Sequence, residues 1–135
     1  MFSKIKDSHD PGHHLPPKTI VYSPIRSVYY ACQGVILGFK REPNLIFQTI
    51  IGFVTALVLA YNKLYLLALV NLIMMFFTLS SEFFNTSIEA VCDLIHPDYS
   101  PKVKVIKDLA AAGVWMISLG WLSFLIYCAY RLWIL

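Results

Sequence analysis

Charged side chains are scarce in this sequence. They make up 14% of the 135 residues, whereas soluble globular domains have about 25%. Hydrophobic residues reach 58%, which excludes a disordered chain, because disorder requires few apolar residues and high charge. A chain of this length forms one domain and cannot hide so much apolar surface from water. The composition therefore favours a small integral membrane protein over a soluble enzyme.

Cysteine is scarce too, and its spacing forms no motif. Cys32, Cys92 and Cys128 are odd in number and form no C-x-x-C pair, so neither a disulfide framework nor a zinc site is expected. The phosphate-binding pattern G-x-x-x-x-G-K-[ST] is absent, which excludes a Walker-type ATPase. The net charge of +3 is too small to indicate a nucleic-acid partner. The first forty residues lack the apolar core of a secretory signal.

Three long segments carry no charge at all. They cover residues 45–62, 64–81 and 109–130. About 18–20 apolar residues in a helix cross the roughly 30 Å hydrocarbon layer of a membrane. We therefore expect an all-α membrane protein with three transmembrane helices, at about 45–62, 64–95 and 108–132, the first two joined by a tight turn.

The N-terminal part of the chain divides at Ser23. Residues 1–22 include three prolines and one glycine, which break helices, and we expect a disordered cytoplasmic tail there. Ser23 followed by Pro24 is a favourable helix start, and apolar residues then recur at helical spacing. This stripe indicates an amphipathic helix at about 23–41 on the membrane surface, although a helix in a soluble core has the same pattern. Residues 23–135 would then form one membrane domain.

Lysine and arginine are distributed unevenly between the expected spans. Six precede the first span and three lie between the second and the third, whereas only Lys63 and Arg131 belong to the other side. Basic residues are enriched in cytoplasmic loops. We therefore expect the N-terminus and the loop after the second span to be cytoplasmic.

The segment 82–93, at the cytoplasmic end of the second span, reads EFFNTSIEAVCD. Its polar residues Glu82, Asn85, Glu89 and Asp93 are spaced so that they lie on one face of a helix. Carboxylates at membrane depth cost at least about 2–3 kcal/mol each, so a functional role is expected. A solvated helix end beyond the membrane is the alternative. It applies better to Asp93 than to Glu82, which directly follows the uncharged segment.

The spacing of the two glutamates indicates two different roles. Glu82 and Glu89 are about two helical turns apart, roughly 10 Å, which is too far to hold one ion without a third group. One carboxylate suits a divalent ion and the other suits a proton. Oxygen ligands favour magnesium, which usually arrives with nucleotide phosphates, and Asn85 is placed to orient a carboxylate or a phosphate oxygen. Lys107, beside Asp108 at the start of the third span, provides a point charge for phosphate.

Three motifs resemble those of the bacterial diacylglycerol kinase family, which includes the undecaprenol kinases. The segment 82–93 is similar to the family signature E-x-x-N-[ST]-[AS]-[IL]-E-x-x-x-D. Residues 107–114, KDLAAAGV, resemble A-K-D-x-A-A-G-A-V from its lysine onward, and residues 30–34, YACQG, resemble Y-A-x-[NQ]-G. The resemblance extends from about Ser23 to the C-terminus, with the three spans in the same order.

The resemblance implies phosphoryl transfer from MgATP to the hydroxyl of a membrane lipid. In the family, the glutamate at the Glu82 position is the general base, and the glutamates at the Glu42 and Glu89 positions hold the metal on the ATP phosphates. We expect nucleotide contacts from Tyr30, Asn85, Asp98, Tyr99, Lys107 and Asp108. The family also implies a homotrimer with active sites shared between subunits, in the plasma (inner) membrane of a bacterium.

The sequence departs from the family pattern shortly after Glu42. Ile46 stands where the family often has an arginine, and the loss of this arginine affects a substrate or phosphate contact. Gln48 stands where the family has an ionisable group. Asn44 and the form of the 30–34 motif look more like the undecaprenol kinases, but diacylglycerol has a primary hydroxyl too, and the acceptor stays open. A catalytically inactive relative, acting as a structural membrane subunit, is the alternative to a kinase. An ion carrier is a third class, which leaves the lysine–aspartate pair unexplained.

Overall fold

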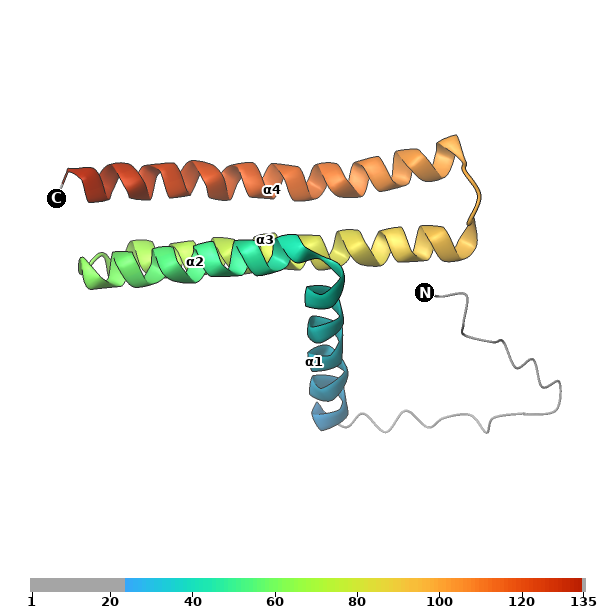
Figure 1. The fold of residues 1–135 in the computed structure, drawn as a ribbon, viewed down its shortest axis with the longest axis horizontal. Coiled ribbons are helices and arrows are strands. Elements are labelled where there is room, and N and C mark those ends of the chain that lie inside the picture. The colour runs from blue at the N-terminus through green and yellow to red at the C-terminus, as the bar shows by residue number, and fades with distance from the viewer. Residues whose placement is uncertain (1–23, 135) are drawn as a thin grey trace. The chain divides into compact units, whose positions relative to one another are not determined.

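The computed structural model describes residues 24–134, which form four α-helices joined by short connections (Figure 1). The helices are α1 (Pro24–Arg41), α2 (Pro43–Tyr61), α3 (Tyr65–Ile95) and α4 (Pro101–Trp133). The last three are long and apolar enough to cross a membrane, which confirms the expected all-α membrane fold. The expected tail at 1–22 and the helix start at Ser23 lie outside the described residues.

The chain divides into two parts, 1–33 and 34–135. In the first part, the rings of Tyr29 and Tyr30 meet edge to face, and Gln33 donates a hydrogen bond to the Tyr29 hydroxyl at 2.7 Å. The second part contains the end of α1 and all of α2, α3 and α4. The amphipathic helix predicted at 23–41 is thus present as α1, and its location on a membrane surface stays a prediction.

Proline starts two of the membrane helices. Pro43 and Pro101 each stand in the first turn, where the missing N–H costs no hydrogen bond. Because Ser100 is extended and Pro101 follows it, α4 begins seven residues before the span expected from residue 108, and its first turns are polar. Between α2 and α3 the chain turns at Lys63, whose φ of 62° is in the left-handed region.

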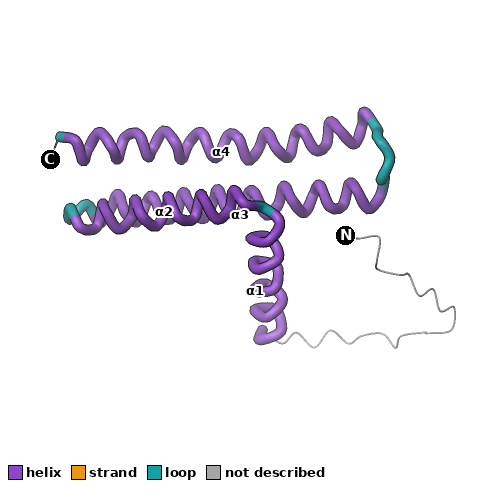
Figure 2. The backbone as a smooth tube through the Cα atoms, viewed as in Figure 1, coloured by secondary structure: helices purple, strands orange, loops and turns teal. Residues whose placement is uncertain are grey.

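α3 is the central helix of the second part. It packs against both α2 and α4, and it runs antiparallel to each of them (Figure 2). One core cluster joins Leu45 of α2, Met75 and Leu79 of α3, and Trp121 of α4. α3 is also longer than α2, so the last turns of α3 extend past the start of α2 and are paired with α4 (Figure 1).

A buried polar network joins the three helices within their apolar segments. Asn71 of α3 is fully buried, and its Nδ2 donates to the backbone oxygen of Gly52 on α2 at 2.8 Å. Trp121 of α4 donates through Nε1 to Asn71 Oδ1 at 3.0 Å. The close approach of α2 depends on Gly52, because a Cβ there would overlap the side chain of Met75. This arrangement fixes the register of the three helices.

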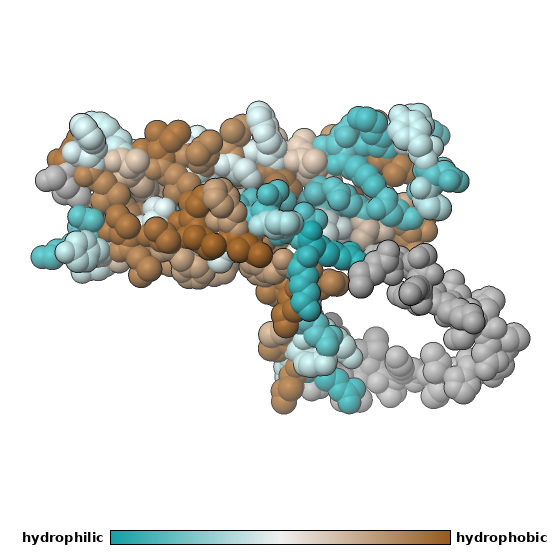
Figure 3. All heavy atoms as spheres, viewed as in Figure 1, coloured by the Kyte–Doolittle hydropathy of each residue, from teal (hydrophilic) through white to brown (hydrophobic). Residues whose placement is uncertain are grey.

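On the face that Figure 3 shows, apolar side chains cover most of the long helices, whereas hydrophilic ones of these helices gather around the connection between α3 and α4. α4 is the most exposed of the three long helices, since only 6% of its apolar window is buried by the rest of the chain. Such a surface is stable in lipid or against further protein rather than in water. The polar end of α3 and α4 is, by the same argument, suited to the aqueous phase rather than to lipid.

Candidate functional site

The acidic segment 82–93 forms the last turns of α3, and its polar face turns toward the rest of the chain. Glu82, Asn85 and Glu89 are half-buried, whereas Phe84 on another face is exposed. These three residues are half-buried together because positions three or four residues apart lie on the same face of a helix. The sequence-based expectation of one shared polar face is thus met at these three positions.

Phe83 packs inward beside this polar face. Its ring lies edge to face against Phe39 near the end of α1, with 6.3 Å between the ring centroids. It also covers Gly38, where a Cβ would overlap the ring. A glycine at this position therefore lets the end of α1 approach α3 directly next to Glu82.

Glu82 is linked to α2 through a side-chain hydrogen bond. Gln48 Nε2 donates to Glu82 Oε1 at 3.0 Å, in a partly buried position. The Gln48 Oε1 atom is buried and has no hydrogen-bond partner among residues 24–134. The antiparallel packing of α2 and α3 brings these residues together although they are 34 positions apart.

Glu89 is held in a similar way by its own helix. Asn85 Nδ2 donates to Glu89 Oε1 at 3.0 Å, one helical turn along α3. Asn85 Oδ1 is buried and, in the described part of the chain, has no partner either. Each of the two glutamates thus accepts one amide hydrogen bond, and each amide keeps an oxygen that can accept another.

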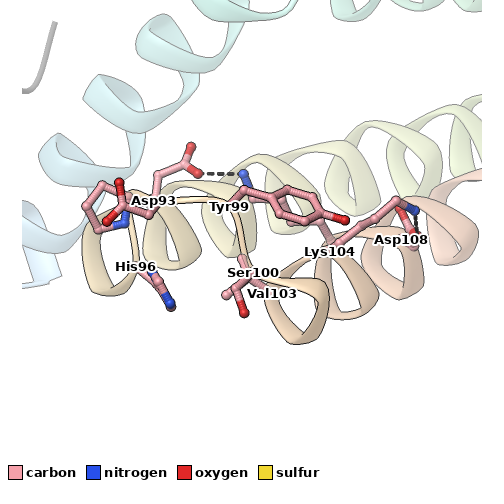
Figure 4. Close-up of a pocket in the computed structure, with 10 residues that line it drawn as sticks. Asp93, His96, Tyr99, Ser100, Val103, Lys104 and Asp108 are labelled. Atoms are coloured by element: carbon pink, nitrogen blue, oxygen red, sulfur yellow. Dashed lines mark hydrogen bonds and ion pairs between the residues drawn. The ribbon is translucent and has the colours of Figure 1, made fainter.

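A pocket of about 340 Å³ lies where α3 ends and α4 begins. It is lined by the loop residues 96–100 and by Asp93, Val103, Lys104, Lys107 and Asp108. Figure 4 shows Asp93 at the end of α3 and Lys104 with Asp108 on α4, with Tyr99 between them. The pocket therefore brings together Asp98, Tyr99, Lys107 and Asp108, four of the residues expected to contact a nucleotide.

Both lysines of the pocket are paired with aspartates. Lys107 Nζ lies 2.5 Å from Asp93 Oδ1, and Lys104 pairs with Asp108 one turn along α4. Both precede the uncharged segment of α4, and these hydrogen bonds raise the pKa of each ammonium group. Three aspartates and two lysines line the pocket, so the acidic side chains outnumber the lysines there.

The structure does not test the roles expected of two further site residues. Glu42 is the residue before α2 and makes no side-chain hydrogen bond to the helix start. Tyr30 belongs to the first part of the chain, where it contacts Tyr29. Their assignments to metal and nucleotide stay predictions.

The family described as prokaryotic diacylglycerol kinase matches residues 29–129, which is most of the chain. The chain belongs to this family. Searches of curated proteins and of solved structures found no match. The matched range contains the 82–93 signature and Lys107 with Asp108, so the predicted resemblance is confirmed, and with it a membrane lipid kinase as the general class.

The side chains at the acidic end of α3 suit a hard divalent cation, of the kind that is bound to the nucleotide substrate of a kinase. The available ligands are oxygens, namely the Glu89 carboxylate and Asn85 Oδ1, which is buried and has no hydrogen-bond partner among residues 24–134, and hard cations prefer oxygen ligands. Within residues 24–134, no three His, Cys, Asp or Glu side chains lie close enough to hold a metal. Magnesium usually combines one or two carboxylates with substrate phosphates. The residues therefore suit an ion shared with ATP rather than a closed protein site.

Sequence reasoning missed two residues of this site. Gln48 is a departure from the diacylglycerol kinase pattern in the sequence, yet it contacts Glu82. The tight turn expected near residue 62 could have indicated this contact. Two antiparallel helices joined at that turn place position 48 near the end of the 64–81 segment. His96 lines the pocket, and no spacing in the sequence marks it.

Proposed function

We propose that the protein transfers the γ-phosphate of ATP to the hydroxyl of a membrane lipid alcohol, either undecaprenol or diacylglycerol. The products are undecaprenyl phosphate or phosphatidic acid, respectively. The observation that carries the proposal is the setting of Glu82. Its carboxylate is half-buried at the end of the uncharged segment 64–81 and is held by Gln48. Membership of a lipid-kinase family supports the same reaction.

Glu82 is the general base in this proposal. A lipid alcohol keeps its chains in the hydrocarbon layer and its hydroxyl at the boundary, which is the level expected for the start of the 82–93 segment. The carboxylate accepts the hydroxyl proton as that oxygen attacks the γ-phosphorus of ATP, the bond from the γ-phosphorus to the β,γ-bridging oxygen breaks, and ADP leaves. General base catalysis contributes about 10²–10⁴-fold to a rate.

The nucleotide occupies the polar end of α3 and α4 in this proposal. The pocket volume of about 340 Å³ is at the low end of ligand sites, which span about 300–1,000 Å³. Lys107 contacts the phosphates after exchanging its partner Asp93 for them, while Asp98, Tyr99 and Asp108 contact the rest of the nucleotide. Tyr30 is assigned to the nucleotide as well.

Glu89, Asn85 and Glu42 are the residues that would hold magnesium on the phosphates. Magnesium supplies neutralisation of the charge that develops on the transferred group, which phosphoryl transfer requires. Glu89 and Asn85 support this role through their half-buried oxygens. The excess of aspartate over lysine in the neighbouring pocket explains why the ion is needed there.

We also infer a homotrimer in a bacterial inner membrane, with the α3–α4 loop in the cytoplasm. Lys102, Lys104 and Lys107 follow this loop, whereas Lys63 and Arg131 lie at the opposite end of the long helices, and basic residues favour the cytoplasmic side. Further subunits would cover α4, of which the chain itself buries little. Three long helices alone enclose no water-shielded site.

A transfer assay with both acceptors tests the proposal. The protein is reconstituted in lipid vesicles with γ-labelled ATP and magnesium, and undecaprenol and diacylglycerol are offered in parallel. Label in the lipid phase is expected, and the ratio of the two products identifies the acceptor. No label in either lipid, from a folded and membrane-inserted protein, would contradict the kinase and favour a structural subunit.

A further inference from the structure

Gln48 is the point at which α2 reaches the polar face of α3. Its amide nitrogen lies 3.0 Å from Glu82 Oε1, while the neighbouring Ile46 and Phe47 are exposed on other faces of the helix. Leu45, one turn earlier, is fully buried in the core cluster with Met75, Leu79 and Trp121. The core therefore fixes the rotation of α2 that turns Gln48 toward Glu82.

We propose that Gln48 is a positioning residue, whose amide holds the Glu82 carboxylate so that Glu82 Oε2 faces the acceptor hydroxyl. This inference rests on the proposed role of Glu82 as the base. An ionised carboxylate only accepts hydrogen bonds, so the amide must present Nε2 to it. That orientation leaves Gln48 Oε1 buried without a protein partner, as observed within residues 24–134.

An amide suits this position better than a second carboxylate would, and it has a further effect. It donates to the carboxylate without adding a second negative charge beside it, and two adjacent carboxylates cannot both ionise readily. It also restrains a flexible glutamate side chain before the substrate arrives. A displacement of about 1 Å in a reacting group can cost about 10²-fold in rate, so the restraint acts on turnover rather than on nucleotide binding.

A double-mutant cycle tests this role. Gln48→Met keeps the length of the side chain and removes the donor, and we expect kcat to fall about 10- to 100-fold with the KM for ATP unchanged. On the Glu82→Gln background, Gln48→Met should cause no further loss, because its effect passes through Glu82. Ser81→Ala is the matched control, since the Ser81 hydroxyl bonds the backbone oxygen of Thr78 on its own helix, and it should keep wild-type turnover.

Infrared spectroscopy provides a readout that does not depend on activity. The carboxylate band of Glu82, identified as the difference from Glu82→Gln, should shift in Gln48→Met and stay in place in Ser81→Ala. Wild-type kcat in Gln48→Met, independent losses in the cycle, or an unmoved band would each overturn the positioning role. If the wild-type protein phosphorylates neither lipid, the proposed function fails, and the infrared band still decides whether Gln48 holds Glu82.

Discussion

Replacing Asn71 with leucine should destabilise the helix bundle measurably. Leucine has the same number and branching of side-chain heavy atoms, so the substitution removes polarity with little change of shape. Two hydrogen bonds disappear, one to the Gly52 oxygen at 2.8 Å and one from Trp121 Nε1 at 3.0 Å. Side-chain hydrogen bonds between membrane helices contribute about 0.6 kcal/mol each on average and at most about 1.7. The expected loss is therefore about 1–3 kcal/mol in the free energy of unfolding.

The assay is a titration of detergent-reconstituted protein with SDS, followed by helix content and tryptophan fluorescence. Ser123→Ala is the matched control, because the Ser123 hydroxyl is exposed and bonds the Leu119 oxygen of its own helix. Its loss should stay below about 0.5 kcal/mol. An Asn71→Leu protein as stable as the control would refute the network as the link between α2, α3 and α4.

Four further substitutions address the helix packing, the metal site and the phosphate contact. Gly52→Ala should cost about 1–3 kcal/mol in the same titration, because the new Cβ overlaps Met75; wild-type stability would contradict the close approach of α2. Glu89→Gln should raise the magnesium concentration needed for half-maximal activity and the KM for ATP, and an unchanged magnesium dependence would remove Glu89 from the metal site. Lys107→Met should raise the KM for ATP about 10- to 100-fold, whereas Lys104→Met should change it much less; equal effects would argue against a specific phosphate contact.

The fold followed closely from the distribution of charge in the sequence. The uncharged segments of 18 residues or more form α2, α3 and α4, because an apolar segment of this length is expected to form a membrane-spanning helix. The start of α4 differed, because Ser100 and Pro101 begin a helix independently of hydropathy. Local rules of helix initiation thus extended the element beyond the predicted span.

The partners of Asn71 and Lys107 could not be predicted from the sequence. Asn71 lies within an uncharged segment, and helical spacing on one chain does not reveal that it faces Gly52 and Trp121. The pairing of Lys107 with Asp93 likewise depends on how the 96–100 loop folds back. The face shared by Glu82, Asn85 and Glu89 was predictable, since it depends on the helical period alone.

The turnover of Glu82→Gln tests the central claim most directly. The variant and the wild-type protein are compared in vesicles with labelled ATP and the preferred lipid, and nucleotide affinity and melting temperature are measured on the same preparations. A base worth about 10²–10⁴-fold predicts a loss of at least about 100-fold in lipid phosphorylation, with ATP affinity and melting temperature nearly unchanged. A variant that keeps more than about a tenth of wild-type turnover, or one that loses ATP binding and stability together with turnover, would contradict the assignment of Glu82 as the general base.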